Sequence, residues 1–190
     1  MKNLTVSVFG YGRFGKFWSK ILSEDFNVKV YSRRGLKREE VDNNIEIVDL
    51  KDLYECDTLF YCVSISSFEE VLKENSKLHK KNCVYFDTCS VKMEPVKWMK
   101  KYITENFEII ASHPMFGPDS YYNSSEPLPI VMHNVSAKDE NFNFWINYFY
   151  KKNLRVEIMT PEEHDKTVAY SQGITHYIGR VLADLNLKPT

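Results

Sequence analysis

The chain has 190 residues, which suits one domain with at most a short appendage and allows a core to be buried without disulfide or metal staples. Its formal net charge of −1 gives no electrostatic basis for binding nucleic acid or an anionic membrane. The sequence has no apolar run long enough to cross a bilayer, and a strand-like run at 4–9 leaves no room for a targeting peptide.

The cysteines predict a reducing compartment. None of the four forms a CxxC pair, and two of them lie in or beside apolar runs. We therefore expect small buried thiols in a cytoplasmic protein, rather than disulfides or a metal site. The residues concerned are Cys56, Cys62, Cys83 and Cys89.

Short apolar runs alternate with segments of helical period along most of the chain. This alternation predicts an α/β fold of Rossmann type, doubly wound around a mainly parallel sheet. Strands are expected at 4–9, 28–31, 45–48, 58–63, 84–87, 109–112, 130–133 and 155–158. Helices are expected at 14–22, 68–78, 96–102 and 142–150, with a turn or short helix at 49–55 and a loop at 119–129.

A last, long helix is predicted from Thr160. Thr160 supplies a cap, Pro161 suits the first helical position, and Glu163 completes a capping box. The helix is expected to reach about Leu187, before Lys188 and Pro189. We divide the chain into a dinucleotide-binding domain at 1–159 and a helical segment at 160–190.

A glycine loop follows the first predicted strand directly and opens the first helix. It reads Gly10-Tyr11-Gly12-Arg13-Phe14-Gly15 and holds three of the seven glycines of the chain. In this context the pattern predicts a dinucleotide site, with the pyrophosphate held by backbone N–H groups at the helix N-terminus. A glycine turn without ligand and a methyltransferase-type loop are less favoured alternatives.

The end of the second strand indicates which dinucleotide binds. A site that prefers NAD usually places an acid there for the ribose hydroxyl. This chain instead has Ser32, Arg33 and Arg34, and a guanidinium with a hydroxyl suits a 2′-phosphate. We therefore predict NADP over NAD, with a solvated basic turn as the alternative.

Three later motifs are specific enough to indicate a family. They are Asp87-Thr88-Cys89-Ser90-Val91-Lys92, His113-Pro114-Met115-Phe116-Gly117-Pro118, and Glu163-His164-Asp165 followed by Ser171-Gln172-Gly173-Ile174-Thr175-His176. Together with the glycine loop, they closely resemble the prephenate/arogenate dehydrogenase family of tyrosine synthesis. The resemblance covers nearly the whole chain in the right order. It implies oxidative decarboxylation of prephenate or arogenate, with hydride transfer from C4 to nicotinamide.

Two residues are expected to take part in that chemistry. His113 lies at a predicted strand end, and an imidazole suits removal of a hydroxyl proton near neutral pH. The family uses the matching histidine for this contact, and the matching serine, Ser90, bridges the substrate hydroxyl and the nicotinamide region. From spacing alone, a structural histidine and a capping serine would be the simpler interpretations. Val63 and Ser64 are expected to line the cofactor.

The last helix offers a polar stripe for the substrate. Gln172, His176 and Arg180 recur every four residues and share one face, and the family binds substrate with a histidine at the position of His176. Lys92 is expected to attract the anionic substrate, with a solvated surface lysine as an equal alternative. For Arg180, a position on a solvated helix face is an equal alternative to substrate binding. His164 is interpreted as structural, and Asp165 either contacts the amine of arogenate or serves the helix N-terminus.

The chain departs from the family after its last helix. Family members usually continue into a helical domain that dimerises and completes the substrate pocket, and a substrate-binding arginine expected there is missing. An Ile/Val/Leu stripe at Ile174, Ile178, Val181, Leu182 and Leu185 favours a homodimer through this helix, or a shortened form of the protein. The alternatives are another β-hydroxyacid-type dehydrogenase, which would use a lysine such as Lys166, and a catalytically incomplete NADP-binding module.

Overall fold

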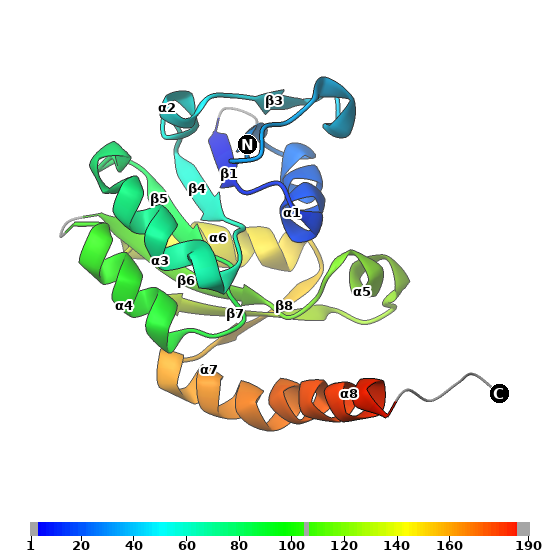
Figure 1. The fold of residues 1–190 in the computed structure, drawn as a ribbon. Coiled ribbons are helices and arrows are strands. Elements are labelled where there is room, and N and C mark those ends of the chain that lie inside the picture. Colours follow the sequence, from blue (N-terminus) through cyan, green and yellow to red (C-terminus); the bar gives the residue numbers. More distant parts are fainter. Residues whose placement is uncertain (1–3, 105–106, 186–190) are drawn as a thin grey trace.

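A computed structural model describes residues 4–104 and 107–185, and its centre is one eight-stranded sheet in the order β3-β2-β1-β4-β5-β6-β7-β8 (Figure 1). All neighbouring strands are parallel except β6 and β7. The Rossmann-type, mainly parallel fold is therefore confirmed. The strands are β1 Thr5–Phe9, β2 Asn27–Tyr31, β3 Ile45–Ile47, β4 Thr58–Tyr61, β5 Val84–Asp87, β6 Glu108–Pro114, β7 Leu128–Asn134 and β8 Leu154–Ile158.

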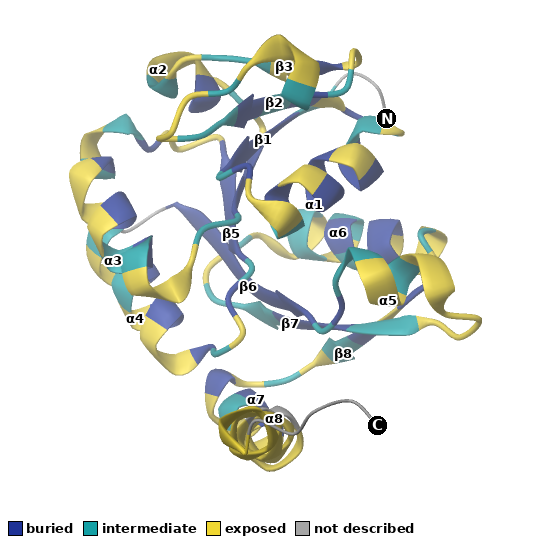
Figure 2. Cartoon of the chain, turned by 45° about the vertical axis from the view of Figure 1, so that its right-hand side comes forward, coloured by how far each residue is buried: buried dark blue, intermediate teal, exposed yellow. Residues whose placement is uncertain are grey.

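Helices cover both faces of the sheet. On one face, α1 (Arg13–Ser23) and α6 (Asp139–Lys151) bury an aromatic cluster that includes Trp18, Phe60 and Trp145. On the other, α3 (Ile65–Glu74) and α4 (Met93–Tyr102) bury Phe68, Leu72 and Met99. The central strands are consequently apolar on both faces, and β4 and β5 are buried along their whole length. Figure 2 shows this burial for β5.

The parallel strands bring four chain segments to one edge of the sheet. The carboxyl ends of β1, β4, β5 and β6 lead into the glycine loop, the Val63-Ser64 segment, the Ser90 loop and His113. Parallel neighbours end on the same side, so motifs far apart in the sequence meet there.

Two predicted segments differ from the structure. The expected loop at 119–129 contains a short helix, α5 (Pro118–Asn123), which begins at a proline that favours the first helical position. The predicted helix from Thr160 is present as α7 (Pro161–Val168), a π-helical segment at Ala169–Gly173 that the prediction did not include, and α8 (Ile174–Asp184), while its expected end near Leu187 lies outside the described residues. The predicted capping box of Thr160 and Glu163 is present.

The remaining helical elements are short: α2 at Leu50–Leu53, and single turns at Arg38–Glu40 and Ser76–Leu78. No helix within 4–104 and 107–185 is long and apolar enough to cross a membrane.

Candidate active site

The glycine loop is shaped by close backbone packing. Gly10 has a φ of +101°, and a Cβ there would lie 2.5 Å from the Cys62 carbonyl oxygen. A Cβ on Gly15 would lie 2.0 Å from the Gly10 carbonyl oxygen, whereas a Cβ on Gly12 would meet nothing within 4 Å. The first and third glycines are therefore required by the fold, and the second borders open space that a ligand can occupy.

The helix that follows presents a free N-terminus. Gly12 caps α1 without a side-chain hydrogen bond, and the first turn contains no acidic residue. The exposed N–H groups and the helix dipole therefore suit an anion such as a pyrophosphate.

A cleft of about 340 Å³ begins at this loop, a volume typical of ligand sites. It brings together most of the residues predicted to bind the cofactor, namely Gly10, Tyr11, Gly12, Ser32, Arg33, Arg34, Val63 and Ser64. Phe9, Cys62 and Ser67 also line it and were not predicted. Ser67 lies in the first turn of α3, a position at which the sequence pattern alone gives no sign of a ligand.

Three residues of the glycine motif do not line this cleft. Arg13 is exposed and pairs with Asp119 of α5, and Phe14 stacks on Trp18 with their ring centroids 5.5 Å apart. Gly15 is buried beneath the loop. The structure thus gives Arg13 and Phe14 contacts within the protein, and a contribution to the cofactor through their backbone stays a prediction.

The far end of the cleft is basic. Arg33 faces Glu70 with 3.7 Å between Nη1 and Oε2, and Arg34 faces Glu40 with 3.2 Å between Nη1 and Oε1. Both arginine side chains are about half exposed, so these ion pairs contribute little to stability and leave both guanidinium groups at the cleft.

Lys92 has a different role from the one expected. Its side chain is 1% exposed, and Nζ donates to Asp87 Oδ2 and, over 2.5 Å, to the carbonyl oxygen of Ser112. Asp87 is completely buried and also accepts from the backbone N–H groups of Cys89 and Ser112. Lys92 is therefore neither solvated nor placed as a direct substrate ligand, and we revise its role to neutralising Asp87.

His113 is the second-last residue of β6 and lies within this buried polar region. Burial lowers its pKa to about 3, and the charge of Lys92 and the neighbouring His164 act in the same direction. The ring is therefore neutral at physiological pH. Its Nδ1 lies 2.9 Å from Nε2 of His164, whose Nδ1 lies 2.7 Å from Oδ1 of Asp165.

Ser90 is exposed in the loop between β5 and α4. Asp165 holds the end of this loop, because its carboxylate accepts from the backbone N–H groups of Lys92, over 2.6 Å, and Met93, over 3.0 Å. Of the two roles considered for Asp165, the structure shows service to a helix N-terminus, although that helix is α4 rather than its own.

Of the polar stripe of the last helix, the structure describes only the side chain of Arg180. The side chains of Gln172 and His176 lie outside the described residues. Arg180 follows His164 by 16 residues of nearly continuous helix, which puts it about 24 Å further along the axis. Arg180 therefore cannot contact a substrate at His113 of the same chain.

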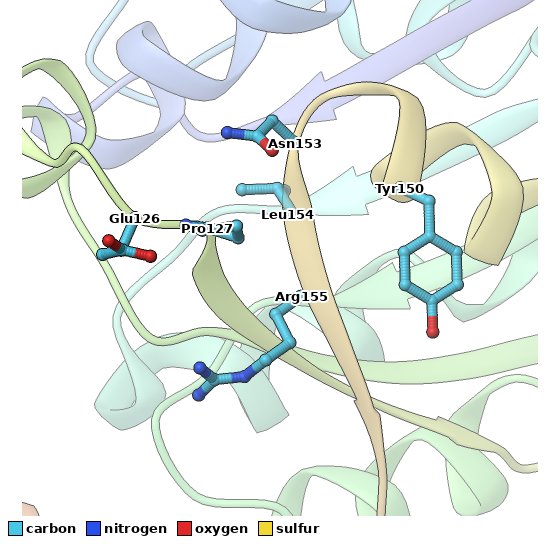
Figure 3. Close-up of a pocket in the computed structure, with 6 residues that line it drawn as sticks. All are labelled: Glu126, Pro127, Tyr150, Asn153, Leu154 and Arg155. Carbon is cyan, nitrogen blue, oxygen red and sulfur yellow. The ribbon is translucent and has the colours of Figure 1, made fainter.

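A larger cavity of about 410 Å³ lies beside the edge strand β8 (Figure 3). Its polar groups come from Glu126, Tyr150, Asn153 and Arg155, and they point in different directions rather than toward a common centre. Arg155 is also paired with Glu157, with 2.8 Å between Nε and Oε1. This cavity has the size of a ligand site without convergent polar groups.

Comparison with known families agrees with this geometry. Residues 20–158 match the family described as prephenate dehydrogenase, nucleotide-binding domain. The chain is 32% identical over 98% of its length to arogenate dehydrogenase 1, chloroplastic, of Arabidopsis thaliana, and covers 31% of that protein. It is 31% identical over 97% of its length to a probable arogenate/prephenate dehydrogenase of Methanocaldococcus jannaschii, and covers 44% of it.

Solved structures show the same fold. Prephenate dehydrogenase from Aquifex aeolicus, in a complex with hydroxyphenyl propionate and NAD+, superimposes with a TM-score of 0.74 at 17% identity, over 97% of this chain and 69% of that one. Pyrroline carboxylate reductase from Plasmodium falciparum, with NADP bound, reaches 0.69 at 12% identity, over 97% of this chain and 68% of that one. The fold is thus shared by a dehydrogenase and a reductase. This chain spans less than half the length of the first two relatives.

Proposed function

Because the chain belongs to the prephenate dehydrogenase family through its nucleotide-binding domain, we propose that it catalyses the NAD(P)-dependent oxidative decarboxylation of prephenate or arogenate. The observation that carries this proposal is the neutral, buried imidazole of His113 at the carboxyl end of β6. That end lies on the sheet edge that also carries the glycine loop and the Ser90 loop. Ligands of open α/β sheets bind at this edge.

The proposed chemistry needs one base. A dinucleotide held at the glycine loop and the N-terminus of α1 would supply a nicotinamide to take up the hydride that leaves C4 of the cyclohexadienol. His113 takes the proton of the 4-hydroxyl, which leaves a ring carbonyl. The bond from C1 to the carboxylate then breaks, CO2 departs, and its electron pair makes the ring aromatic and places a negative charge on the oxygen. That oxygen recovers the proton from His113, so the step needs no further acid.

A weak base is sufficient for this reaction. The 4-hydroxyl becomes strongly acidic as the hydride leaves C4, so the proton passes readily even to an imidazole of low pKa. Burial keeps His113 unprotonated well below neutral pH and thus ready to accept. Ser90, exposed in the neighbouring loop, is proposed to hold the same hydroxyl.

The preferred cofactor is proposed to be NADP. Ser32, Arg33 and Arg34 line the cleft together, and no acid occupies 31–35. The open space at Gly12 and the free N-terminus of α1 fit the pyrophosphate. Two relatives are named as NADP enzymes: the probable prephenate dehydrogenase of Schizosaccharomyces pombe and the prephenate dehydrogenase of Saccharomyces cerevisiae, at 26% and 27% identity.

We further propose that the protein is a homodimer joined through α8. The apolar stripe Ile174, Ile178, Val181, Leu182 and Leu185 is 41–59% exposed, as expected for a helix that packs on a partner. In such a dimer His176, Gln172 and Arg180 of one subunit would serve the substrate of the other. Light scattering should show twice the monomer mass, and Ile178→Asp with Leu182→Asp should restore the monomer. A wild-type monomer would exclude this assembly.

A cytoplasmic location is also proposed. Two Arabidopsis relatives are named chloroplastic, so fractionation of cells that express the tagged native protein is the direct test. Recovery with an organelle rather than with the cytosol would refute it.

The test of the activity is reduction of NADP and of NAD, each with prephenate and with arogenate. We expect turnover with at least one substrate, a lower KM for NADP, and a loss of at least about 100-fold in kcat in His113→Asn with cofactor binding retained. His133→Gln, on neighbouring β7, is the matched control. Near-normal turnover by His113→Asn would remove it from the mechanism.

Two alternatives have distinct outcomes in the same assay. Cofactor binding without turnover of either substrate would identify a catalytically incomplete module. Oxidation of a simple β-hydroxyacid that is abolished in Lys166→Ala would favour a β-hydroxyacid-type dehydrogenase. Lys166 lies exposed on α7.

A further inference from the structure

We propose that His164 and Asp165 are positioning residues that fix His113 in one tautomer, with the proton on Nδ1 and Nε2 free to accept a proton from substrate. The inference rests on the proposed role of His113 as the base. It concerns two residues that the sequence analysis interpreted as structural or amine-binding. Their contacts with His113 join β6 to α7, elements separated by about fifty residues of sequence.

The three side chains form a buried chain of hydrogen bonds. His164 is fully buried and His113 is 5% exposed. The two rings meet edge to face, with centroids 5.1 Å apart and an interplanar angle of 75°. This geometry directs one nitrogen of each ring at the other, over 2.9 Å, and leaves Nε2 of His113 outside the chain.

The direction of these hydrogen bonds follows from Asp165. Burial alone would raise the pKa of its carboxyl, but hydrogen bonds from Met93, His164 and Lys92 lower it. The carboxylate is therefore ionised and can only accept, so Nδ1 of His164 must carry a proton.

Only one placement of the remaining ring protons is then possible. Burial lowers the pKa of His164 as well as that of His113, so each ring is neutral and has one N–H. Nε2 of His164 is consequently an acceptor, and Nδ1 of His113 must donate to it. Nε2 of His113 is left with a free lone pair, as a base requires.

Asp165 also couples the base to the Ser90 loop. The same carboxylate accepts from the backbone N–H groups of Lys92 and Met93, where that loop enters α4. Movement of this loop and misorientation of the imidazole are therefore opposed by a single group. As His113 gains a proton, its Nδ1–H bond to His164 strengthens, and the negative charge of Asp165 stabilises the imidazolium.

The decisive variant is Asp165→Leu. Leucine removes the acceptor of the His164 Nδ1–H group, so a proton on that nitrogen would be buried without a partner, whereas a proton on Nε2 of His164 can donate to Nδ1 of His113. His113 would then carry its proton on Nε2 and could no longer serve as the base. We expect kcat to fall by at least about 100-fold, while the KM for NADP changes little.

The tautomer itself can be observed without catalysis. In ¹⁵N-edited long-range NMR spectra of the full chain, His113 should appear with Nδ1 protonated in the wild type and with Nε2 protonated in Asp165→Leu. Its signals are assigned by their loss in His113→Asn. A wild-type His113 protonated on Nε2, or an unchanged tautomer and kcat in Asp165→Leu, would overturn the proposal.

A second pair of variants covers the case in which Asp165→Leu fails to fold. His164→Gln places an amide oxygen where it can still accept from Nδ1 of His113, whereas His164→Leu removes the acceptor. We expect His164→Gln to keep kcat within about tenfold of wild type and His164→Leu to lose at least about 100-fold. Equal losses in both would refute the inference.

The pH dependence provides a further check. The charged and titratable groups around His113 are Lys92 and Asp87 from one side and His164 and Asp165 from α7. Asp165→Leu removes the group that raises the pKa of His113, so any residual activity should resist acid further than wild type. If the wild type shows no turnover but the tautomer of His113 inverts in Asp165→Leu, the positioning role stands and the proposed reaction is rejected instead.

Discussion

Removing the ammonium of Lys92 should destabilise this protein more than most single substitutions. Lys92→Met preserves most of the side-chain volume, so little packing is lost. It leaves Asp87, which is 0% exposed, as a buried carboxylate with only two backbone N–H donors. Breaking one side of a buried ion pair costs about 3–5 kcal/mol, which in a chain of this size corresponds to a fall in Tm of about 6–20 °C.

The assay is thermal and urea unfolding followed by tryptophan fluorescence. Lys97→Met is the matched control, because Lys97 pairs with Glu94 on the surface of α4 with 62% of its side chain exposed, and its loss should change Tm little. Adding Asp87→Asn to Lys92→Met should recover part of the lost stability, since it removes the uncompensated charge. A cost below about 1 kcal/mol for Lys92→Met would refute the inference that Lys92 neutralises a buried charge.

The other predictions concern the cofactor loop and the base. Gly15→Ala should fail to fold or have a Tm many degrees lower, because its Cβ would lie 2.0 Å from a carbonyl oxygen. Gly12→Ala should keep its Tm, because its Cβ would meet nothing within 4 Å, and should lose NADP affinity in a fluorescence titration. A normal NADP affinity in Gly12→Ala would contradict the proposed approach of the pyrophosphate. The double variant Arg33→Ala with Arg34→Ala should raise the KM for NADP about 10- to 1000-fold and leave the KM for NAD unchanged. Equal changes in the two KM values would contradict a 2′-phosphate site. The unfolded chain protonates His113 near pH 6.5, but the folded chain does so only near pH 3, so stability falls as the pH drops through this window. His113→Asn should reduce that fall in urea unfolding at pH 7 and pH 4, and an unchanged fall would show that His113 is not buried in its neutral form.

The fold, and the presence of most residues predicted to bind the cofactor in one cleft, could be predicted from the sequence because both depend on local patterns. Strands buried on both faces are read from continuous apolar runs, and the glycine loop is read from fixed spacing. The short helix α5 was missed because Ser, Asn and Tyr dominate 119–125, and these residues favour loops when taken alone. The division of the last helix at Ala169–Gly173 likewise has no signal in the hydrophobic period.

The buried polar contacts around His113 could not be predicted for a different reason. Lysine is almost never fully buried without a partner, so Lys92 was assigned to solvent or substrate. Its partner Asp87 was visible at a strand end, but their contact depends on how the loop from β5 folds back. His164 and Asp165 were visible as a motif, yet only the packing of α7 on the sheet edge brings them to His113.

The buried charges around His113 are balanced in a way that would favour the proposed proton transfer. Lys92 and Asp87 cancel each other, while Asp165 has no charged partner as long as both imidazoles are neutral. A proton on His113 supplies the missing positive charge, two hydrogen bonds away from Asp165. Burial opposes this proton in the resting protein, so the base stays free. The attraction of Asp165 operates only once the proton has begun to move, and an interaction that strengthens in the transition state lowers the barrier without tightening the binding of substrate.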